Sequence, residues 1–326
     1  METAGLPCQP NSRAGAGQFE EDPRFFKYIV WAAKHWWLGT IFLLLENVHG
    51  LKLFIIELLF GLFYHIWAVE AKPEHQGHSG VARPRLYILM LHRMKGVAMY
   101  DPVTLYKQVS DDLMMRFRTL PRDYMTATPR DIEIFAMRLA STRGIEYKPA
   151  ARLRSSYYCS SSVTMFPSLG HSTRMSQPVN STAKATNDMT YLLTDREKAA
   201  IDELDHRYEQ LHPGCSPRSD PDLVYFLGDN PWSWSPTWSA ISGRIPRFRL
   251  NDGLYWFPAH KRAMCAKDKL SALGMPVDHW YCEQMGVKPV GIEDSQRAYL
   301  LAGNAMTVAI VQLIGLSCFR KCSSTG

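Results

Sequence analysis

The sequence lacks the features that mark several large classes of protein. Glycine and proline are not in excess, at 21 and 20 of 326 residues, and this excludes a collagen-like chain. No charge dominates, because 37 Lys and Arg stand against 31 Asp and Glu. A formal charge of +6 permits nucleic acid as a partner without demanding it. With 46% hydrophobic residues the composition is that of a globular protein, and the length allows one large domain or two.

Paired cysteines are also lacking. The seven cysteines are an odd and widely scattered set, and no basic segment followed by an apolar stretch opens the sequence. We therefore expect a reducing, intracellular location. Cys318 and Cys322 come nearest to the spacing of metal ligands, but no second pair lies nearby in the sequence. No metal site is expected.

An uninterrupted apolar segment of membrane-spanning length is lacking too. Residues 40–67 form the longest apolar run, but charged and polar residues interrupt it, and Gly50 and Gly61 fall where elements end. Each charge at the centre of a bilayer costs about 2.5–3.5 kcal/mol. We therefore expect no membrane partner. The run instead predicts a strand, a helix and a second strand, at residues 41–45, 51–60 and 64–69.

Helix and strand patterns continue on both sides of this run. Residues 25–37 have helical length with an apolar face, and residues 85–91 (RLYILML) indicate another strand. This alternation predicts an α/β fold whose parallel sheet is covered by helices. Sites in such sheets form at the carboxyl ends of strands, where Glu46 follows the strand at 41–45. Taken alone, a solvated loop acid or a helix cap explains Glu46 better than a site does.

A second candidate group lies near the start of the sequence. Residues 5–10 (GLPCQP) place Cys8 between two prolines, in backbone that can hardly be helical. A nucleophilic thiol needs such fixed geometry and a nearby positive charge, and Arg83 and Arg85 precede the strand at 85–91. Considered by itself, the PCQP segment is more typical of a free cysteine in a disordered terminal tail, and the combination with the arginines favours the nucleophile.

Five segments, in family order, resemble motifs of the DNA (cytosine-5)-methyltransferases. GLPCQPNSRAGAGQFEEDPR, from residue 5, resembles the catalytic-loop motif. FLLLENVHGL, from residue 42, resembles the Glu-Asn-Val motif, and GVARPRLYI, from residue 80, resembles the Gln-x-Arg-x-Arg motif. The segments at 262–278 and 296–314 are similar to the ninth and tenth motifs. The resemblance covers residues 5–93 and 230–316, and the middle of the chain lies outside it.

The resemblance implies an activity and a role for each matching residue. Cys8 is then the nucleophile that adds to C6 of cytosine, and Glu46 holds the ring nitrogen and the exocyclic amine. Arg83 and Arg85 hold the carbonyl and the phosphate. The substrate is DNA with its target base flipped out of the duplex. A DNA substrate implies a nuclear location, although no clear basic cluster supports it.

The resemblance also implies S-adenosyl-L-methionine as the methyl donor, with Gly303 and Asn304 lining its pocket. The Phe-x-Gly-x-Gly loop and the first four strands of the family fold do not precede Cys8 here. We therefore expect a partial Rossmann-like, S-adenosylmethionine-dependent methyltransferase fold that lacks its first strands. The strand at 41–45 is then an exposed edge.

Smaller departures from the family pattern leave the proposed catalytic groups in place. Asn11 stands where the family has Phe, Val81 where it has Gln, and Met275 where it has Phe. Two alternatives to an active enzyme remain open. One is that the missing strands come from elsewhere, either from a second polypeptide that makes this chain half of a split enzyme or from a true start upstream of Met1. The other is an inactive DNA-binding or regulatory relic.

The domain organisation follows from the same resemblance. Residues 1–93 are expected to form a catalytic half-domain, residues 94–257 an irregular α+β target-recognition region, and residues 258–326 C-terminal helices that return to the catalytic domain. A low-information insertion explains the middle region equally well. Helices are expected there at 101–120 and 129–139, and from a capping box at 194–197 to residue 211. The Ser/Thr-rich stretch 155–187 is expected to be a loop.

The segment 231–257 is rich in tryptophan and arginine. Interleaved aromatic and basic side chains suit phosphate contact and base stacking, and they suit a packed subdomain equally well. We assign phosphate contact to the arginines and core packing to the tryptophans. The arginines concerned are Arg244, Arg247 and Arg249.

Overall fold

The computed structural model describes residues 2–11, 21–149, 188–232, 238–249, 253–277, 279–284 and 286–289. The chain divides into two compact units. Unit 1 includes Met1–Gln76 and Arg83–Met115, and unit 2 includes Gly77–Ala82 and the chain from Arg116 to Asn304. The functional ranges assigned above to residues 1–93, 94–257 and 258–326 stay a prediction.

A four-stranded sheet in the order β1-β2-β4-β3 forms the centre of unit 1. β1 pairs in parallel with β2, whereas β4 pairs antiparallel with both β2 and β3. The fold is therefore α/β with a mixed sheet, and the strands expected at 41–45, 64–69 and 85–91 are confirmed. The four strands are Glu2–Gly5 (β1), Phe42–Asn47 (β2), Tyr64–Ala71 (β3) and Arg85–His92 (β4).

The expectation of a parallel sheet is wrong for β4. Helix α2 (Leu53–Phe60) connects β2 to β3, so these two strands run in the same direction, but they are not neighbours. The described connection from β3 to β4 contains only the 3-10 turn Pro73–Gln76. Because no crossover helix reverses the chain there, β4 returns antiparallel and inserts between the two.

The expectation that residues 41–45 form an exposed edge is also wrong. β1 pairs with β2 from Glu2 opposite Leu43 to Gly5 opposite Glu46. All six residues of β2 are buried, as is typical of an internal strand with both faces covered. The sequence pattern missed β1 because it is four residues long and contains two small side chains.

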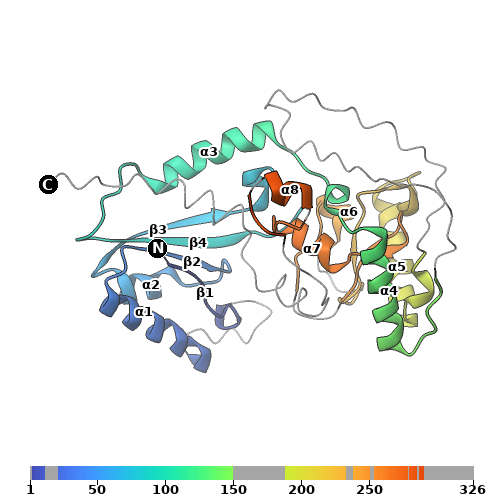
Figure 1. The fold of residues 1–326 in the computed structure, drawn as a ribbon, viewed down its shortest axis with the longest axis horizontal. Coiled ribbons are helices and arrows are strands. Elements are labelled where there is room, and N and C mark those ends of the chain that lie inside the picture. Colours follow the sequence, from blue (N-terminus) through green and yellow to red (C-terminus); the bar gives the residue numbers. More distant parts are fainter. Residues whose placement is uncertain are drawn as a thin grey trace. The chain divides into compact units, whose positions relative to one another are not determined.

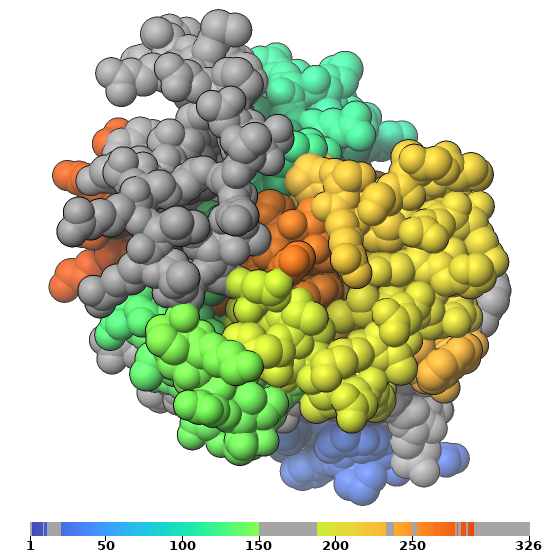
Figure 2. All heavy atoms as spheres, turned by 90° about the vertical axis from the view of Figure 1, so that its right-hand side faces the viewer, coloured from blue at the N-terminus to red at the C-terminus, as the bar shows by residue number. Residues whose placement is uncertain are grey.

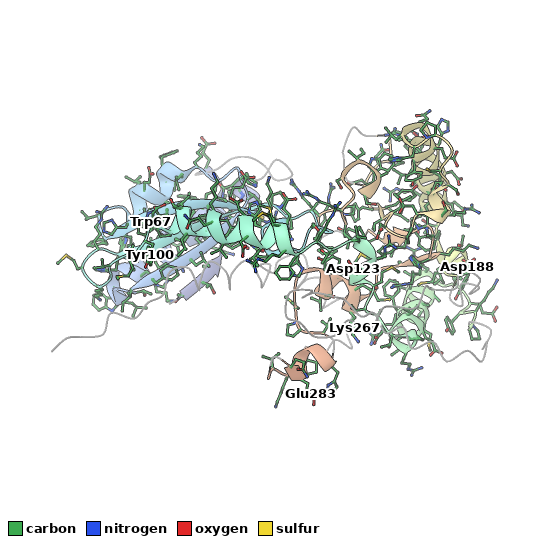
Figure 3. The ribbon with its side chains drawn as sticks, turned by 90° about the horizontal axis from the view of Figure 1, so that it is seen from above. Trp67, Tyr100, Asp123, Asp188, Lys267 and Glu283 are labelled. Carbon is green, nitrogen blue, oxygen red and sulfur yellow. The ribbon has the colours of Figure 1, made fainter. Side chains whose placement is uncertain are left out.

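Helices cover both faces of this sheet. Figure 1 shows α1 (Phe26–Leu38) and α2 on one side of the strands and α3 (Pro102–Arg116) on the other. Leu43 and Leu45 pack with α1 and α2 in one core. Leu44 packs with Tyr106 of α3 in the second core, and Figure 3 shows Trp67 of β3 beside α3. In the described part of the chain, no helix is long and apolar enough to cross a bilayer.

Helix α1 is apolar on both of its sides. One side faces the core through Tyr28, Trp31, Ala32 and His35. Phe26, Val30 and Trp37 lie on the opposite side of the helix, and they are 65%, 51% and 90% exposed. A helix that is apolar all round is normally buried all round, so this outward side is unusual for a surface helix.

Unit 2 has its own core, formed by helices and a small antiparallel sheet in the order β5-β6-β7. Thr128 and Thr194 each form a capping box at the start of a helix, and the second box and its helix are confirmed. Figure 2 shows α4 in green and α5 in yellow side by side, joined by an ion pair of 2.6 Å between Arg143 and Glu197. The α-helices and strands are Pro129–Arg143 (α4), Asp195–Leu211 (α5), Tyr225–Phe226 (β5), Ser239–Ser242 (α6), Tyr255–Phe257 (β6), Arg262–Ala263 (β7), Ala266–Ala272 (α7) and His279–Gln284 (α8).

Short 3-10 turns complete the described secondary structure. Those not yet named are Gln9–Asn11, Pro23–Phe25, Pro121–Tyr124, Thr190–Leu192 and Pro217–Ser219. In unit 2, a buried polar network links the segment Gly77–Ala82 to the turn at Pro121–Tyr124. His78 Nδ1 lies 3.0 Å from the hydroxyl of Tyr124, which is also 2.7 Å from the hydroxyl of Thr119.

Candidate active site

The ends of three strands meet at one edge of the unit 1 sheet. Gly5 pairs with Glu46 in the parallel register of β1 and β2, so the segment carrying Cys8 leaves β1 where β2 ends. β4 runs in the opposite direction and therefore begins at this edge, with Arg85. The sheet thus brings together Glu46, Arg85 and the Cys8 segment. The rule for carboxyl ends of strands accounts for Glu46 and the Cys8 segment, whereas Arg85 reaches this edge because β4 runs antiparallel.

Glu46 and Arg85 form an ion pair at this edge. Arg85 Nε lies 2.9 Å from Glu46 Oε1, and the two side chains are only 14% and 10% exposed. Arg85 also donates from Nη1 to the carbonyl oxygen of Pro84 at 2.8 Å. A hydrogen bond between ionised groups at such low exposure is strong and directional. Arg85 therefore fixes the orientation of the Glu46 carboxylate.

Tyr87 shows how closely the charged groups are gathered. It lies opposite Glu46 in the register of β2 and β4 and is completely buried. Burial raises the pKa of Tyr87, the Glu46 carboxylate raises it further, and Arg83 and Arg85 oppose the increase. Arg83 is itself buried. The Glu46 carboxylate and both predicted arginines are therefore close enough to Tyr87 to influence its pKa.

The backbone around Cys8 is held on both sides of the thiol. Before it, the carbonyl oxygens of Leu6 and Pro7 accept hydrogen bonds from Asn47 Nδ2 at 3.2 Å and from the Tyr28 hydroxyl at 2.9 Å. After it, the Asn11 amide N–H donates to the carbonyl oxygen of Cys8 at 3.0 Å. Cys8 itself is half-buried. The fixed geometry expected from the two prolines is therefore reinforced by three hydrogen bonds.

A positive charge lies near Cys8 on a residue to which the sequence assigned no role. Arg24 donates to both carboxylate oxygens of Asp22, at 2.9 and 2.5 Å. These hydrogen bonds lower the pKa of Asp22 to about 2. The Asp22 carboxylate raises the pKa of Arg24, and Cys8 adds to the increase. The only sequence signal for this charge was that Asp22 and Arg24 end the segment that resembles the catalytic-loop motif, where the family has Asp-x-Arg.

Two further residues of the site could not be identified from the sequence. Tyr28 contributes its hydroxyl from the buried side of α1, where an aromatic residue at helical spacing normally indicates only core packing. Asn11 was noted only as a departure from the family pattern. Its Nδ2 lies 3.1 Å from the Tyr28 hydroxyl.

Several predicted residues lie outside the described part of the chain. These include Gly303 and Asn304, with the whole segment 296–314, and the loop expected at 155–187. In the ninth-motif segment, Arg262 and Asp268 form a buried ion pair of 2.7 Å in unit 2. Within the described ranges, no group of three or more His, Cys, Asp or Glu residues could hold a metal ion.

The structure shows the environment of several residues in the tryptophan-rich segment. Trp238 and Trp256 are buried in the core of unit 2, as expected for packing residues. Arg249 forms an ion pair with Asp229 and lies over the ring of Phe226. A contact between Arg249 and phosphate stays a prediction.

Comparisons of the whole chain with known proteins found similarity to solved structures. No protein-family model matches the sequence, and no curated protein matches it. The methyltransferase EhMeth of Entamoeba histolytica is similar with a TM-score of 0.41 and 12% identity, over 97% of this chain and 76% of that one. A mutant of DNMT2 from Spodoptera frugiperda is similar with a TM-score of 0.40 and 13% identity, over 98% of this chain and 78% of that one. At these values, a function for this chain has to be argued from its own residues.

Proposed function

We propose that this chain is a DNA (cytosine-5)-methyltransferase, in which the thiol of Cys8 adds to C6 of a flipped-out cytosine. One observation carries the proposal. A half-buried thiol, in backbone that hydrogen bonds hold on both sides, extends from the sheet edge where a buried carboxylate is paired with an arginine. The resemblance of the five sequence segments, in family order, to motifs of the DNA (cytosine-5)-methyltransferases supports cytosine as the base.

The residues divide the reaction between them. The Cys8 thiolate forms a bond to C6, and the electron pair of the C5–C6 double bond moves toward C5. The Glu46 carboxylate, oriented by Arg85, accepts a hydrogen bond from the exocyclic amine, next to the ring nitrogen where charge develops during the addition. Arg24 supplies a positive charge near the Cys8 side chain. When the proton leaves C5, the bond between sulfur and C6 breaks and the Cys8 thiolate is restored.

S-adenosyl-L-methionine supplies the methyl group when it is bound. The two residues expected to hold it, Gly303 and Asn304, lie outside the described residues. The described groups at the sheet edge are a thiol, a carboxylate and guanidinium groups, and they fit the base. DNA as partner and the nucleus as location belong to the same proposal.

A second polypeptide is the further partner that we propose. Among the described strands, β1 pairs only with β2, so its other edge is able to accept a strand. A chain that adds strands there would make this protein one half of a split enzyme. The alternative of a regulatory relic would keep DNA binding but form no covalent bond to the base.

Trapping with 5-fluorocytosine tests the covalent step. The last step of the reaction removes a proton from C5, and a fluorine atom at that position cannot be removed in the same way. A competent protein therefore stays covalently attached to a duplex that contains this base when S-adenosyl-L-methionine is present. We expect a denaturant-resistant adduct with the wild-type protein, none with Cys8→Ala, and a wild-type yield with Cys215→Ala, which removes an exposed thiol of unit 2. No adduct from folded protein, alone or with a polypeptide that carries the Phe-x-Gly-x-Gly strands, would contradict the proposal.

A further inference from the structure

One hydroxyl group joins three segments of unit 1 at the candidate active site. Tyr28, on α1, is 1% exposed. Its hydroxyl donates to the carbonyl oxygen of Pro7 at 2.9 Å and accepts from the side-chain amides of Asn11 at 3.1 Å and Asn47 at 2.7 Å. A phenol has one proton to donate and two lone pairs to accept with. These three hydrogen bonds therefore use its full capacity.

The two amides extend this connection to both ends of the Cys8 segment. Asn47 also donates from Nδ2 to the carbonyl oxygen of Leu6, while its Oδ1 accepts from the backbone N–H of Val48. Asn11 donates from its backbone to the carbonyl oxygen of Cys8. The carbonyls of three consecutive residues up to and including Cys8 are thus held either by Tyr28 or by a residue bound to it.

The chemistry of the partners makes the arrangement specific. Asn11 stands where the family resemblance leads us to expect Phe, a side chain that could not donate to a hydroxyl. Burial raises the pKa of Tyr28, so the phenol keeps the proton that it donates to Pro7. The Tyr28 hydroxyl is also close to the reactive groups, because Cys8 and Glu46 both add to the increase in its pKa.

We propose that Tyr28 is a positioning residue whose hydroxyl sets the backbone that carries the Cys8 thiol. The proposal rests on the function proposed above for Cys8. Through Pro7 and the two asparagines, Tyr28 couples the orientation of α1 to the place of the nucleophile beside Glu46. Loss of the hydroxyl would free the Cys8 segment without removing any group that touches the base.

The test compares Tyr28→Phe with Tyr64→Phe. Tyr64 belongs to the same core and is also fully buried. Its hydroxyl bonds to the carbonyl oxygens of Thr40 and His35, before β2 begins rather than where it ends. Two readouts are needed. One is the rate of alkylation of each cysteine by iodoacetamide between pH 6.5 and 9, followed on peptides by mass spectrometry; the other is the rate of adduct formation with 5-fluorocytosine DNA.

We expect iodoacetamide to alkylate Cys8 about tenfold faster in Tyr28→Phe than in the wild type. Loss of one hydrogen bond of ordinary strength frees the segment that carries Cys8 and makes the thiol more accessible. Adduct formation at saturating DNA should slow by about tenfold, with the half-saturating DNA concentration unchanged. Tyr64→Phe should match the wild type in both. Equal Cys8 alkylation in the two variants would overturn the proposal. If no protein forms an adduct, the function proposed for Cys8 fails, while the alkylation rates still decide the role of Tyr28.

Hydrogen exchange of the backbone amides of β2 reports whether the core of unit 1 has opened. All six residues of β2 are buried, and their exchange should stay slow in Tyr28→Phe. If it becomes fast, Asn11→Leu decides instead, because it removes one hydrogen bond and leaves the Tyr28 ring in the core. Faster alkylation confined to Cys8 in that variant supports the proposal, and a wild-type rate contradicts it.

Discussion

Among single residues, His78 gives this protein a pH-dependent stability. It is buried in unit 2, with Nδ1 3.0 Å from the Tyr124 hydroxyl. Burial disfavours the charged imidazolium and lowers the pKa of His78 to about 4, against about 6.5 in an unfolded chain. Between these two values the unfolded state binds more protons than the folded state. Stability therefore falls as the pH falls through this window.

We expect the free energy of unfolding to drop between pH 7 and pH 4 by about 3 kcal/mol more in the wild type than in His78→Gln. Urea unfolding at pH 7, 6, 5 and 4 measures the two slopes. His206→Gln, which replaces an exposed histidine of α5, should keep the wild-type slope. If the wild type and His78→Gln changed in parallel, the imidazole would not be the group responsible.

The residues proposed as reacting groups were selected from motif chemistry, whereas the residues that position them were not. The location of Glu46 follows from where β2 ends, but Arg85 reaches the same edge only because β4 runs antiparallel, which the sequence did not predict. The roles of Tyr28 and Arg24 depend on which side of α1 faces the loop and on how the chain turns into that helix. Those are packing outcomes, and no local pattern specifies them.

Among the elements, the loop after β1 and the turn after β2 approach each other closely. A Cβ atom added to Gly50 would lie 2.0 Å from the carbonyl oxygen of Asn11, so this turn needs a glycine for close approach rather than for a special backbone angle. The two segments that carry the site are therefore packed through their backbones.

Gly50→Ala is expected to push the Cys8 segment away from the turn and to destabilise unit 1 by about 1–3 kcal/mol. It should also change the alkylation rate of Cys8. Gly144→Ala is the matched control: its Cβ meets nothing within 4 Å, and only its positive φ of 63° opposes the substitution, at about 1–2 kcal/mol. Chemical unfolding and Cys8 alkylation separate the two, and an unchanged Cys8 rate in Gly50→Ala would refute the close approach.

Elements were predicted well where their signal is local. The continuous apolar run of β2 and the capping box at Thr194 each specify an element within a few residues. β1 was missed because its short segment has no apolar pattern, and the direction of β4 was missed because it depends on the length and helix content of a connection. Strand pairing is a property of two segments, and one segment cannot reveal it.

For the whole molecule, we expect the outward side of α1 to promote association in solution. Phe26, Val30 and Trp37 present apolar surface there, and exposed apolar patches promote association. We expect Trp37→Lys to lower the tendency to aggregate, and to change the unfolding free energy by no more than about 0.5 kcal/mol, because the residue is a surface one.

Met115→Lys provides the control, since it adds the same charge at a residue that is 81% exposed at the end of α3. Light scattering against concentration measures the effect. Equal scattering by Trp37→Lys and Met115→Lys would mean that net charge, not the α1 surface, sets the solubility.

The place of β4 between β2 and β3 has a consequence for how the chain is made. β2 and β3 do not pair with each other, so a nascent chain that has emerged only as far as Gly80 holds two unjoined strands and no ladder between them. Residues 85–92 then close two ladders at once. The same strand delivers Arg85 to Glu46. On the ribosome, β4 therefore completes both the sheet and the charged pair, whereas an earlier nascent chain holds at most β1 paired with β2 and a Glu46 carboxylate without Arg85.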